Sequence, residues 1–126
     1  MANPRHWHDG PATLQVGTER IPLEVAASYR ARTRGLLGRD GIDGALLLTP
    51  AASVHTFGMR FAIDVAYLDR RLRVIAVTTT APGRLGLPRP RSRHVLEAEA
   101  GAMAGWGLRV GTPVQVETAP RPAPGP

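Results

Sequence analysis

Short apolar segments, separated at close intervals by glycine and proline, constrain the fold of this chain more than any other feature. Each segment is rich in Val, Leu, Ile or Ala and covers about four to eight residues, which is typical of β-strands and too short for core helices. Apolar residues at Val74, Ile75 and Val77 cover both faces of one segment, which predicts a central strand. The segments predicted as strands are residues 13–16, 21–25, 45–48, 54–57, 63–68, 72–79, 94–98 and 113–118.

One region has a helical rather than an alternating period. Residues 26–38 carry apolar positions at helical spacing, with Ser28 as a candidate N-cap and Gly35 and Gly38 at the end. The predicted fold class is therefore mainly β (α+β): a small antiparallel or mixed β-barrel of about seven short strands, with one short helix packed at an end. An open α+β sheet is the alternative, because the strand count alone does not distinguish the two.

The length of the chain fits one domain with its own core and is too short for two. We expect this single β-rich domain to cover residues 13–118. Residues 1–12 are polar and interrupted by proline and glycine, which predicts a flexible N-terminus. Residues 119–126, APRPAPGP, predict a disordered proline-rich tail.

Composition excludes several kinds of site. The chain has no cysteine, which excludes a disulfide framework, a thiolate nucleophile and a zinc–thiolate site. All basic residues are arginine, and the net charge of +6 does not indicate nucleic-acid binding without a clustered basic face. Neither a signal peptide nor a run long enough to span a bilayer is recognisable, so a cytoplasmic protein is expected by default. Export stays open if a longer chain precedes Met1.

Residues 53–69, SVHTFGMRFAIDVAYLD, place polar or polarisable side chains inside an apolar run. Buried polar groups are costly unless they are paired, so this segment predicts either a small site or the hydrogen-bonded lining of a β-structure. The side chains concerned are those of His55, Met59, Arg60 and Asp64.

Asp64 shares a strand face with Leu68, which predicts a partly buried carboxylate that needs hydrogen-bond donors. Arg60 and Arg39 are the expected partners. In one interpretation Asp64 is structural, as an ion pair or a backbone-capping carboxylate that fixes the Gly58 turn. In the other, it is an acid that faces a ligand.

His55 is a candidate general base, with Asp64 or Glu97 orienting its second ring nitrogen. The alternative is a histidine that packs at a barrel mouth and bonds a backbone carbonyl. We expect no metal and no cofactor, because His94 and Glu97 lie three residues apart and face opposite sides of a strand.

Glu97 lies on the same strand face as Glu99. If that face is outward, both carboxylates are solvated; if it meets the barrel mouth, Glu97 becomes a partner for Arg34 or Arg39. Met59 is either core filler or part of a binding surface.

A local basic cluster occupies the Pro/Gly/Arg loop of residues 81–93, APGRLGLPRPRSR. Its arginines are suited to gripping phosphates or an acidic partner, or are simply solvated. No aromatic residue is interleaved for base stacking, which argues against single-stranded nucleic acid. The arginines are Arg84, Arg89, Arg91 and Arg93.

Three blocks of sequence carry a resemblance to a known family. They are ARTRGLLGR at residues 31–39, the segment 53–69, and HVLEAEAG at residues 94–101 followed by GWGLRVG at 105–111. In order and spacing they resemble the prokaryotic DUF192 family (domain of unknown function 192), and the resemblance covers nearly all of residues 13–118.

The resemblance implies a compact β-rich domain without an agreed enzymatic activity, in a family of which many members carry an upstream export or membrane segment. Many members have an aromatic residue before the methionine, where this chain has Gly58, which weakens any proposal of aromatic stacking beside Met59. The positions that match the family's motif are Arg34, Gly35, Leu36, Arg39, His55, Phe57, Met59, Asp64, Glu97 and Gly101.

The leading hypothesis is a non-catalytic binding or accessory module that presents a shallow polar cleft to a small molecule, glycan or peptide. The first alternative is a hydrolase that uses His55 with Asp64 or Glu97 as acid and base. The second is an anion or nucleic-acid binder that acts through the Arg84–Arg93 loop. The oligomeric state stays open. The expected ligand-binding residues are His55, Phe57, Met59, Arg60, Asp64 and Glu97, and the expected structural motif consists of Arg34, Gly35, Leu36, Arg39 and Gly101.

Overall fold

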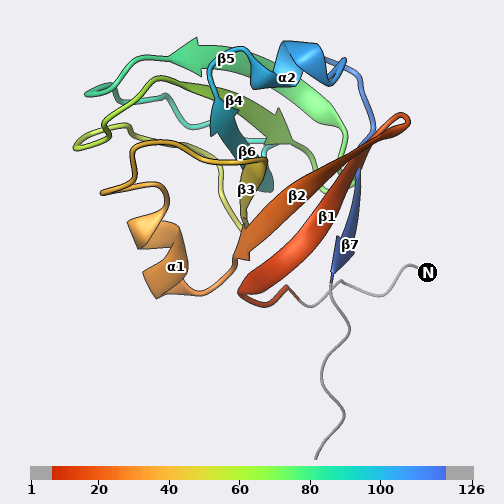
Figure 1. The fold of residues 1–126 in the computed structure, drawn as a ribbon, viewed down its shortest axis with the longest axis horizontal. Coiled ribbons are helices and arrows are strands. Elements are labelled where there is room, and N and C mark those ends of the chain that lie inside the picture. The colour runs from red at the N-terminus through yellow and green to blue at the C-terminus, as the bar shows by residue number, and fades with distance from the viewer. Residues whose placement is uncertain (1–6, 119–126) are drawn as a thin grey trace, which may run out of the picture.

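The fold is built on one seven-stranded mixed sheet with two short helices (Figure 1). The computed structural model describes residues 7–118. The predicted mainly β class is confirmed, and the fold has a second short helix in addition to the expected one. In chain order the elements are β1 Gly10–Val16, β2 Glu19–Ala26, α1 Tyr29–Arg34, β3 Ala45–Leu48, β4 Ile63–Leu68, β5 Val74–Thr80, β6 His94–Glu99, α2 Ala102–Gly105 and β7 Gln115–Thr118.

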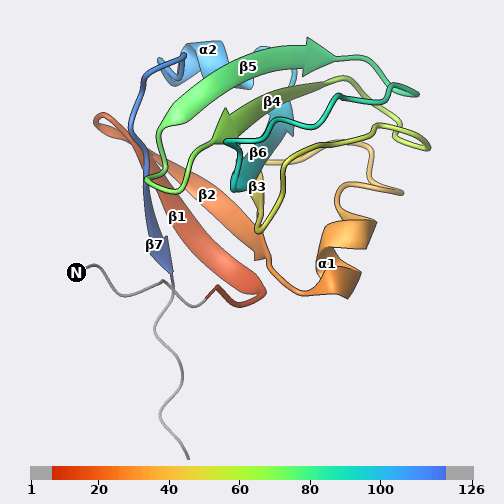
Figure 2. The ribbon, with the colours of Figure 1, turned by 180° about the vertical axis from the view of Figure 1, so that it is seen from behind.

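The strand order is β5-β4-β6-β3-β2-β1-β7, and all neighbours are antiparallel except β2 and β3, which run parallel. Figures 1 and 2 show that the sheet curls strongly, with α1 and α2 on opposite sides of the molecule. The sheet is not closed, so the word barrel describes it only loosely: β5 and β7 remain its edges. The start of β5 bonds instead to the segment just before β7, through Val74 N to Thr112 O (2.9 Å) and Gly111 N to Val74 O (2.8 Å).

Two details of the predicted strands are also corrected. Residues 72–79 were expected at the centre of the sheet, but β5 is an edge strand whose apolar side chains pack against core clusters on both faces. Residues 54–57 form no strand, and within them only His55 makes an isolated bridge, to Leu85. The reason is that Thr56 N bonds to Arg84 O (2.8 Å), in a loop rather than in a neighbouring strand.

The central strands β3, β4 and β6 separate two apolar clusters, one on each face of the sheet. Alternate residues of β6 point to opposite clusters: Leu96 and Ala98 to the first, Val95 to the second. The first cluster also contains α2 residue Met103, and the second contains Leu36, which follows α1. A polar residue on these strands is therefore buried whichever face it points to. Its position in the alternation of the strand decides which of the two clusters it contacts.

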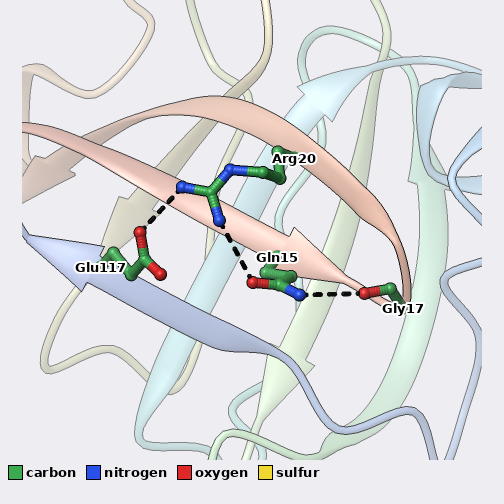
Figure 3. Close-up of polar contacts among 4 residues, drawn as sticks. All are labelled: Gln15, Gly17, Arg20 and Glu117. Carbon is green, nitrogen blue, oxygen red and sulfur yellow. Dashed lines mark hydrogen bonds and ion pairs between the residues drawn. The ribbon is translucent and has the colours of Figure 1, made fainter.

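The β1–β2 hairpin and β7 expose one face to solvent, where a chain of polar contacts crosses the strands (Figure 3). Arg20 donates to the Glu117 carboxylate (2.8 Å) and to the Gln15 side-chain oxygen (3.3 Å). Gln15 in turn donates to the Gly17 carbonyl (3.2 Å). This hydrogen bonding lowers the pKa of Glu117 and raises that of Arg20.

The predicted loose ends fall mainly outside the described residues. Residues 1–6 of the expected flexible N-terminus and the whole expected tail, residues 119–126, lie there. Within residues 7–12, β1 already begins at Gly10, and the Asp9 carboxylate accepts hydrogen bonds from Ala27 N (2.6 Å) and Ser28 N (2.8 Å). These bonds tie the start of the described chain to the approach of α1.

Of the helices in residues 7–118, neither has the length and apolarity that crossing a membrane requires.

Candidate functional site

A cavity of about 90 Å³ lies between α1 and the sheet, on the face of the second apolar cluster. Four segments line it: the end of α1 with the turn that follows, the end of β3, residues 53–59, and β6. Its polar lining comprises Arg32, Thr33, Arg34, Ser53, His55 and Glu97. Three of the six predicted ligand-binding residues therefore meet here: His55, Met59 and Glu97.

Glu97 reaches this cavity because of its register in the sheet. It pairs with Val65 of β4 and Leu46 of β3, both of which belong to the second cluster. Its side chain is only 4% exposed, and no described residue forms a hydrogen bond or salt bridge with it. Burial alone raises the pKa of the Glu97 carboxyl to about 7. The carboxyl thus exchanges its proton near neutral pH.

The end of α1 brings two guanidinium groups to the same cavity. Ser28 caps the helix by accepting a hydrogen bond from Ala31 N (3.1 Å), as the sequence predicts. Arg32 is held by a hydrogen bond to Pro50 O (3.2 Å), whereas Arg34 is exposed. Neither forms a salt bridge with a carboxylate of residues 7–118, so the expected pairing of Glu97 with Arg34 is not formed.

The turn after α1 lies close against Glu97. Gly35 ends the helix with φ 47° and ψ −128°, and its N–H bonds to Ala31 O (2.9 Å). A Cβ at this position would lie 4.0 Å from Glu97 Oε1, and φ in this range strains any residue with a side chain. The backbone conformation rather than the space beside Glu97 therefore favours glycine here, and Leu36 after it is buried in the second cluster.

His55 stands at the exposed side of the cavity. The ring stacks on Phe57, with 5.4 Å between ring centroids and an interplanar angle of 23°, and makes no hydrogen bond to a described residue. Phe57 itself does not line the cavity but lies half-exposed beside it. Met59 is buried in the second cluster and also lines the cavity, so it serves as core and as wall.

Buried Thr56 fixes the segment that carries His55. Its hydroxyl donates to Ala81 O (2.7 Å) and accepts from Arg84 N (2.8 Å). Gly86 N bonds to Val54 O (2.8 Å), and a Cβ on Gly86 would come within 2.9 Å of that oxygen. The Pro/Gly/Arg loop of residues 81–93 thus supports the wall of the cavity through its backbone.

Asp64 lies on the other face of the sheet, away from the cavity. It accepts hydrogen bonds from Thr79 Oγ1 (2.7 Å), Gly101 N (2.9 Å) and Met103 N (3.1 Å). The expectation that His55 and Asp64 converge is therefore wrong: the acid in the cavity with His55 is Glu97. Asp64 is a backbone-capping carboxylate, but at the start of α2 rather than at the Gly58 turn.

The arginines expected beside Asp64 pair elsewhere. Arg60 donates to Asp40 (3.1 Å) at an exposed position outside the cavity, and Arg39 donates to Glu24 (2.8 Å). Of the structural motif, Gly101 supplies one of the N–H groups that bind Asp64. The reason for these differences is the register, which turns Asp64 toward α2.

The arginines of the 81–93 loop do not act as one group. The Arg89 guanidinium lies over the Tyr67 ring, with Cζ 4.5 Å from its centroid, whereas Arg84, Arg91 and Arg93 are exposed. Within residues 7–118, no three His, Asp or Glu side chains are placed to hold a metal ion.

Among the arginine, histidine and glutamate residues that line the cavity, Arg32 is the one that the sequence does not single out. The sequence feature that could have indicated it is the run of arginines at 30, 32 and 34 in a short segment without acidic residues. This run ends at the motif positions Arg34 and Gly35.

The sequence model of the DUF192 family, described as Uncharacterized ACR, matches residues 12–116. A UPF0127 protein of Pyrococcus horikoshii is 33% identical over 84 residues, which cover 63% of this chain and 73% of that protein. A UPF0127 protein of Pyrococcus abyssi is 29% identical over 98 residues, which cover 74% and 84% of the two chains.

Two solved structures are similar to this one. A protein of unknown function from Novosphingobium aromaticivorans gives a TM-score of 0.68 at 20% identity and covers 83% of each chain. A putative transcription regulator from Sinorhizobium meliloti gives a TM-score of 0.74 at 14% identity, covering 89% of this chain and 98% of that one. At these identities the likeness shows the fold alone.

Proposed function

This chain belongs to the uncharacterised DUF192 family, and we propose that it is a non-catalytic binding module that takes a small molecule in the cavity around Glu97. The observation that carries the proposal is the Glu97 carboxyl, which is buried at the cavity without a hydrogen-bond partner among the described residues. A buried polar group without a partner costs about 1–3 kcal/mol in protein contexts. A bound molecule that donates to Glu97 removes that cost.

Asp64 supports this interpretation by contrast. It is as deeply buried as Glu97, yet three donors satisfy it. The fold is therefore able to supply partners to a buried carboxylate, and at Glu97 it leaves the position open toward a cavity. A partner from outside the chain is the simplest account of that difference.

The test is a thermal-shift screen with small amino acids, hydroxy acids, amines and sugars at pH 7.5. We expect at least one compound to raise the melting temperature of the wild type, and Glu97→Ala to abolish the shift. Glu99→Gln is the matched control, because Glu99 follows two residues later on β6, is exposed and does not line this cavity. A screen with no shift, or a shift that survives Glu97→Ala, overturns the proposal.

Acid/base hydrolysis is the second candidate, and one observation favours it. Glu97, with its pKa raised to about 7 by burial, shares the cavity with His55 and Ser53. Against it, the His55 ring bonds neither to Ser53 nor to Glu97, so no nucleophile–base pair is assembled. Turnover of p-nitrophenyl esters that Glu97→Gln and His55→Asn each abolish would favour the enzyme; equal background rates would exclude that activity.

A further inference from the structure

We propose that the ligand of this cavity is a small aliphatic α-amino acid, bound by its ammonium group at Glu97 and by its carboxylate at Arg32 and Arg34. The inference rests on the proposed binding function and names the class of molecule that fulfils it. It is drawn from the charges of the lining, from the groups left without partners, and from the size of the cavity.

The cavity presents both signs of charge to one small volume. Glu97 comes from the sheet, and Arg32 and Arg34 come from the end of α1. A simple amine that pairs with Glu97 would meet two guanidinium groups of like charge. A simple carboxylate would pair with the arginines and leave Glu97 without a donor. A zwitterion carries a partner for each side in one small molecule.

The two arginines are available for this role. Three other arginines of the described chain form salt bridges: Arg20 with Glu117, Arg39 with Glu24 and Arg60 with Asp40. Arg32 and Arg34 form none with a carboxylate of residues 7–118. The bond from Arg32 to Pro50 O fixes one of its nitrogens and so orients the guanidinium before a ligand arrives.

Size and lining limit the side chain of the ligand. The cavity measures about 90 Å³. Because a water molecule takes up about 30 Å³ in the liquid, this volume corresponds to about three waters. It therefore encloses the ammonium, carboxylate and Cα of an amino acid, and a short side chain, up to that of valine, extends toward the exposed side at His55. Apolar walls from Leu36, Leu48 and Met59 favour an aliphatic side chain over a polar one.

Binding should also be coupled to release of a proton. Glu97 pairs with an ammonium group only when it is ionised, and below pH 7 burial keeps it largely protonated. Its β-sheet neighbours, Leu46 and Val65, are apolar. The charged or titratable groups that share the cavity are Arg32 and Arg34 from α1 and His55 from the 53–59 segment. Affinity therefore increases as pH rises toward 7, by up to about tenfold per unit, and is constant above it.

The experiment is isothermal titration calorimetry of the full chain with four matched compounds. They are L-valine, isobutylamine (no carboxylate), isovalerate (no amine) and 2-hydroxy-3-methylbutanoate (hydroxyl in place of ammonium). We expect valine to bind at least about tenfold more tightly than each of the other three at pH 7.5. If any of them equals valine, the zwitterion assignment is overturned.

Variants assign the two ends of the ligand. Glu97→Gln should weaken valine binding at least about tenfold and remove its pH dependence, whereas His55→Asn should keep that dependence and Glu99→Gln should change nothing. Arg34→Gln should weaken valine more than it weakens isobutylamine. Full binding of valine by Glu97→Gln overturns the inference. If valine fails but another compound of the screen binds in a Glu97-dependent way, only this inference falls; if nothing binds, the proposed function falls with it.

Discussion

Two buried carboxylates on opposite faces of the same sheet are treated in opposite ways by this fold. Asp64 and Glu97 are each 4% exposed and lie on adjacent strands. Asp64 receives two backbone N–H groups and a hydroxyl, whereas Glu97 receives no hydrogen bond from the described chain and faces a cavity. Burial alone therefore does not reveal what an acidic residue does; the inventory of its donors does.

The difference arises from what covers each face. α2 begins directly after Asp64's partner strand, and its first turn directs Gly101 N and Met103 N at Asp64. The end of α1 and the turn after it cover the other face, where no N–H group of the described chain donates to Glu97. On one face the buried carboxylate is thus hydrogen-bonded by backbone N–H groups, and on the other it faces a cavity.

Substitution of Asp64 should have the largest effect on stability. Asp64→Ala leaves one buried and one partly buried backbone N–H group without an acceptor, each of which costs about 1–3 kcal/mol, so we expect a loss of about 3–5 kcal/mol in the free energy of unfolding. Urea unfolding followed by circular dichroism measures it. Asp64→Asn is the matched control, because its amide oxygen still accepts these bonds, and it should lose clearly less. Equal stability of Asp64→Ala and wild type would break the comparison.

Glu97→Gln should increase the free energy of unfolding rather than decrease it, and only at high pH. The folded ligand-free protein holds the Glu97 proton up to about pH 7, whereas the unfolded chain releases it near 4.5. Between these values the folded state binds more protons, so its stability falls as pH rises, by about 3 kcal/mol in total. The glutamine variant does not lose this contribution. It should match the wild type near pH 4.5 and exceed it by about 2–3 kcal/mol at pH 8.

Paired urea titrations at the two pH values test this, with Glu99→Gln as the exposed control on the same strand. A glutamine variant that is less stable than the wild type at pH 8 would mean that Glu97 has donors after all. The carboxylates on the two faces would then not differ in having hydrogen-bond donors.

Gly86→Ala should have an intermediate effect and should reach the cavity indirectly. A Cβ at Gly86 would lie 2.9 Å from Val54 O and 3.2 Å from Tyr67 Oη, so the loop must shift, at a cost of about 1–3 kcal/mol. Because Val54 precedes His55 in the cavity wall, ligand-induced thermal shifts should decrease as well.

The same substitution at Gly105 is the control for this prediction. Gly105 lies in α2, where a Cβ would meet nothing within 4 Å, so Gly105→Ala should be neutral or stabilise by up to about 1 kcal/mol. Differential scanning calorimetry measures both variants. If the two have equal effects, the close approach at Gly86 carries no cost.

Local features of this fold could be predicted from the sequence, because they depend on neighbours along the chain. Alternation correctly places Asp64 on the face of Ala66 and Leu68, and Ser28 is the helix cap that its position predicts. Glycine and proline spacing likewise gives most strand segments to within a few residues.

The site itself depends on register between strands that are distant in sequence. Asp64 pairs with Ala98, and Val65 pairs with Glu97, so the two acids point to opposite faces. A shift of one residue would have placed them together, as the sequence alone allowed. Likewise, nothing local shows that the Arg20 and Arg60 side chains find carboxylates whereas Arg34 does not.

The smallest effect is expected for an exposed carboxylate, which completes the comparison. Glu117 accepts a hydrogen bond from Arg20 on the solvent face of the sheet, and both side chains are more than half exposed (Figure 3). Solvent and salt screen such a pair, so Glu117→Gln should leave the melting temperature within experimental error in 150 mM salt. A small decrease should appear only at low ionic strength, and differential scanning fluorimetry at two salt concentrations measures it. If Glu117→Gln were as damaging as Asp64→Ala, burial would not decide how much a hydrogen-bonded carboxylate contributes to stability. If Glu117→Gln has no effect while Asp64→Ala destabilises, hydrogen bonds to a carboxylate contribute mainly where the carboxylate is buried.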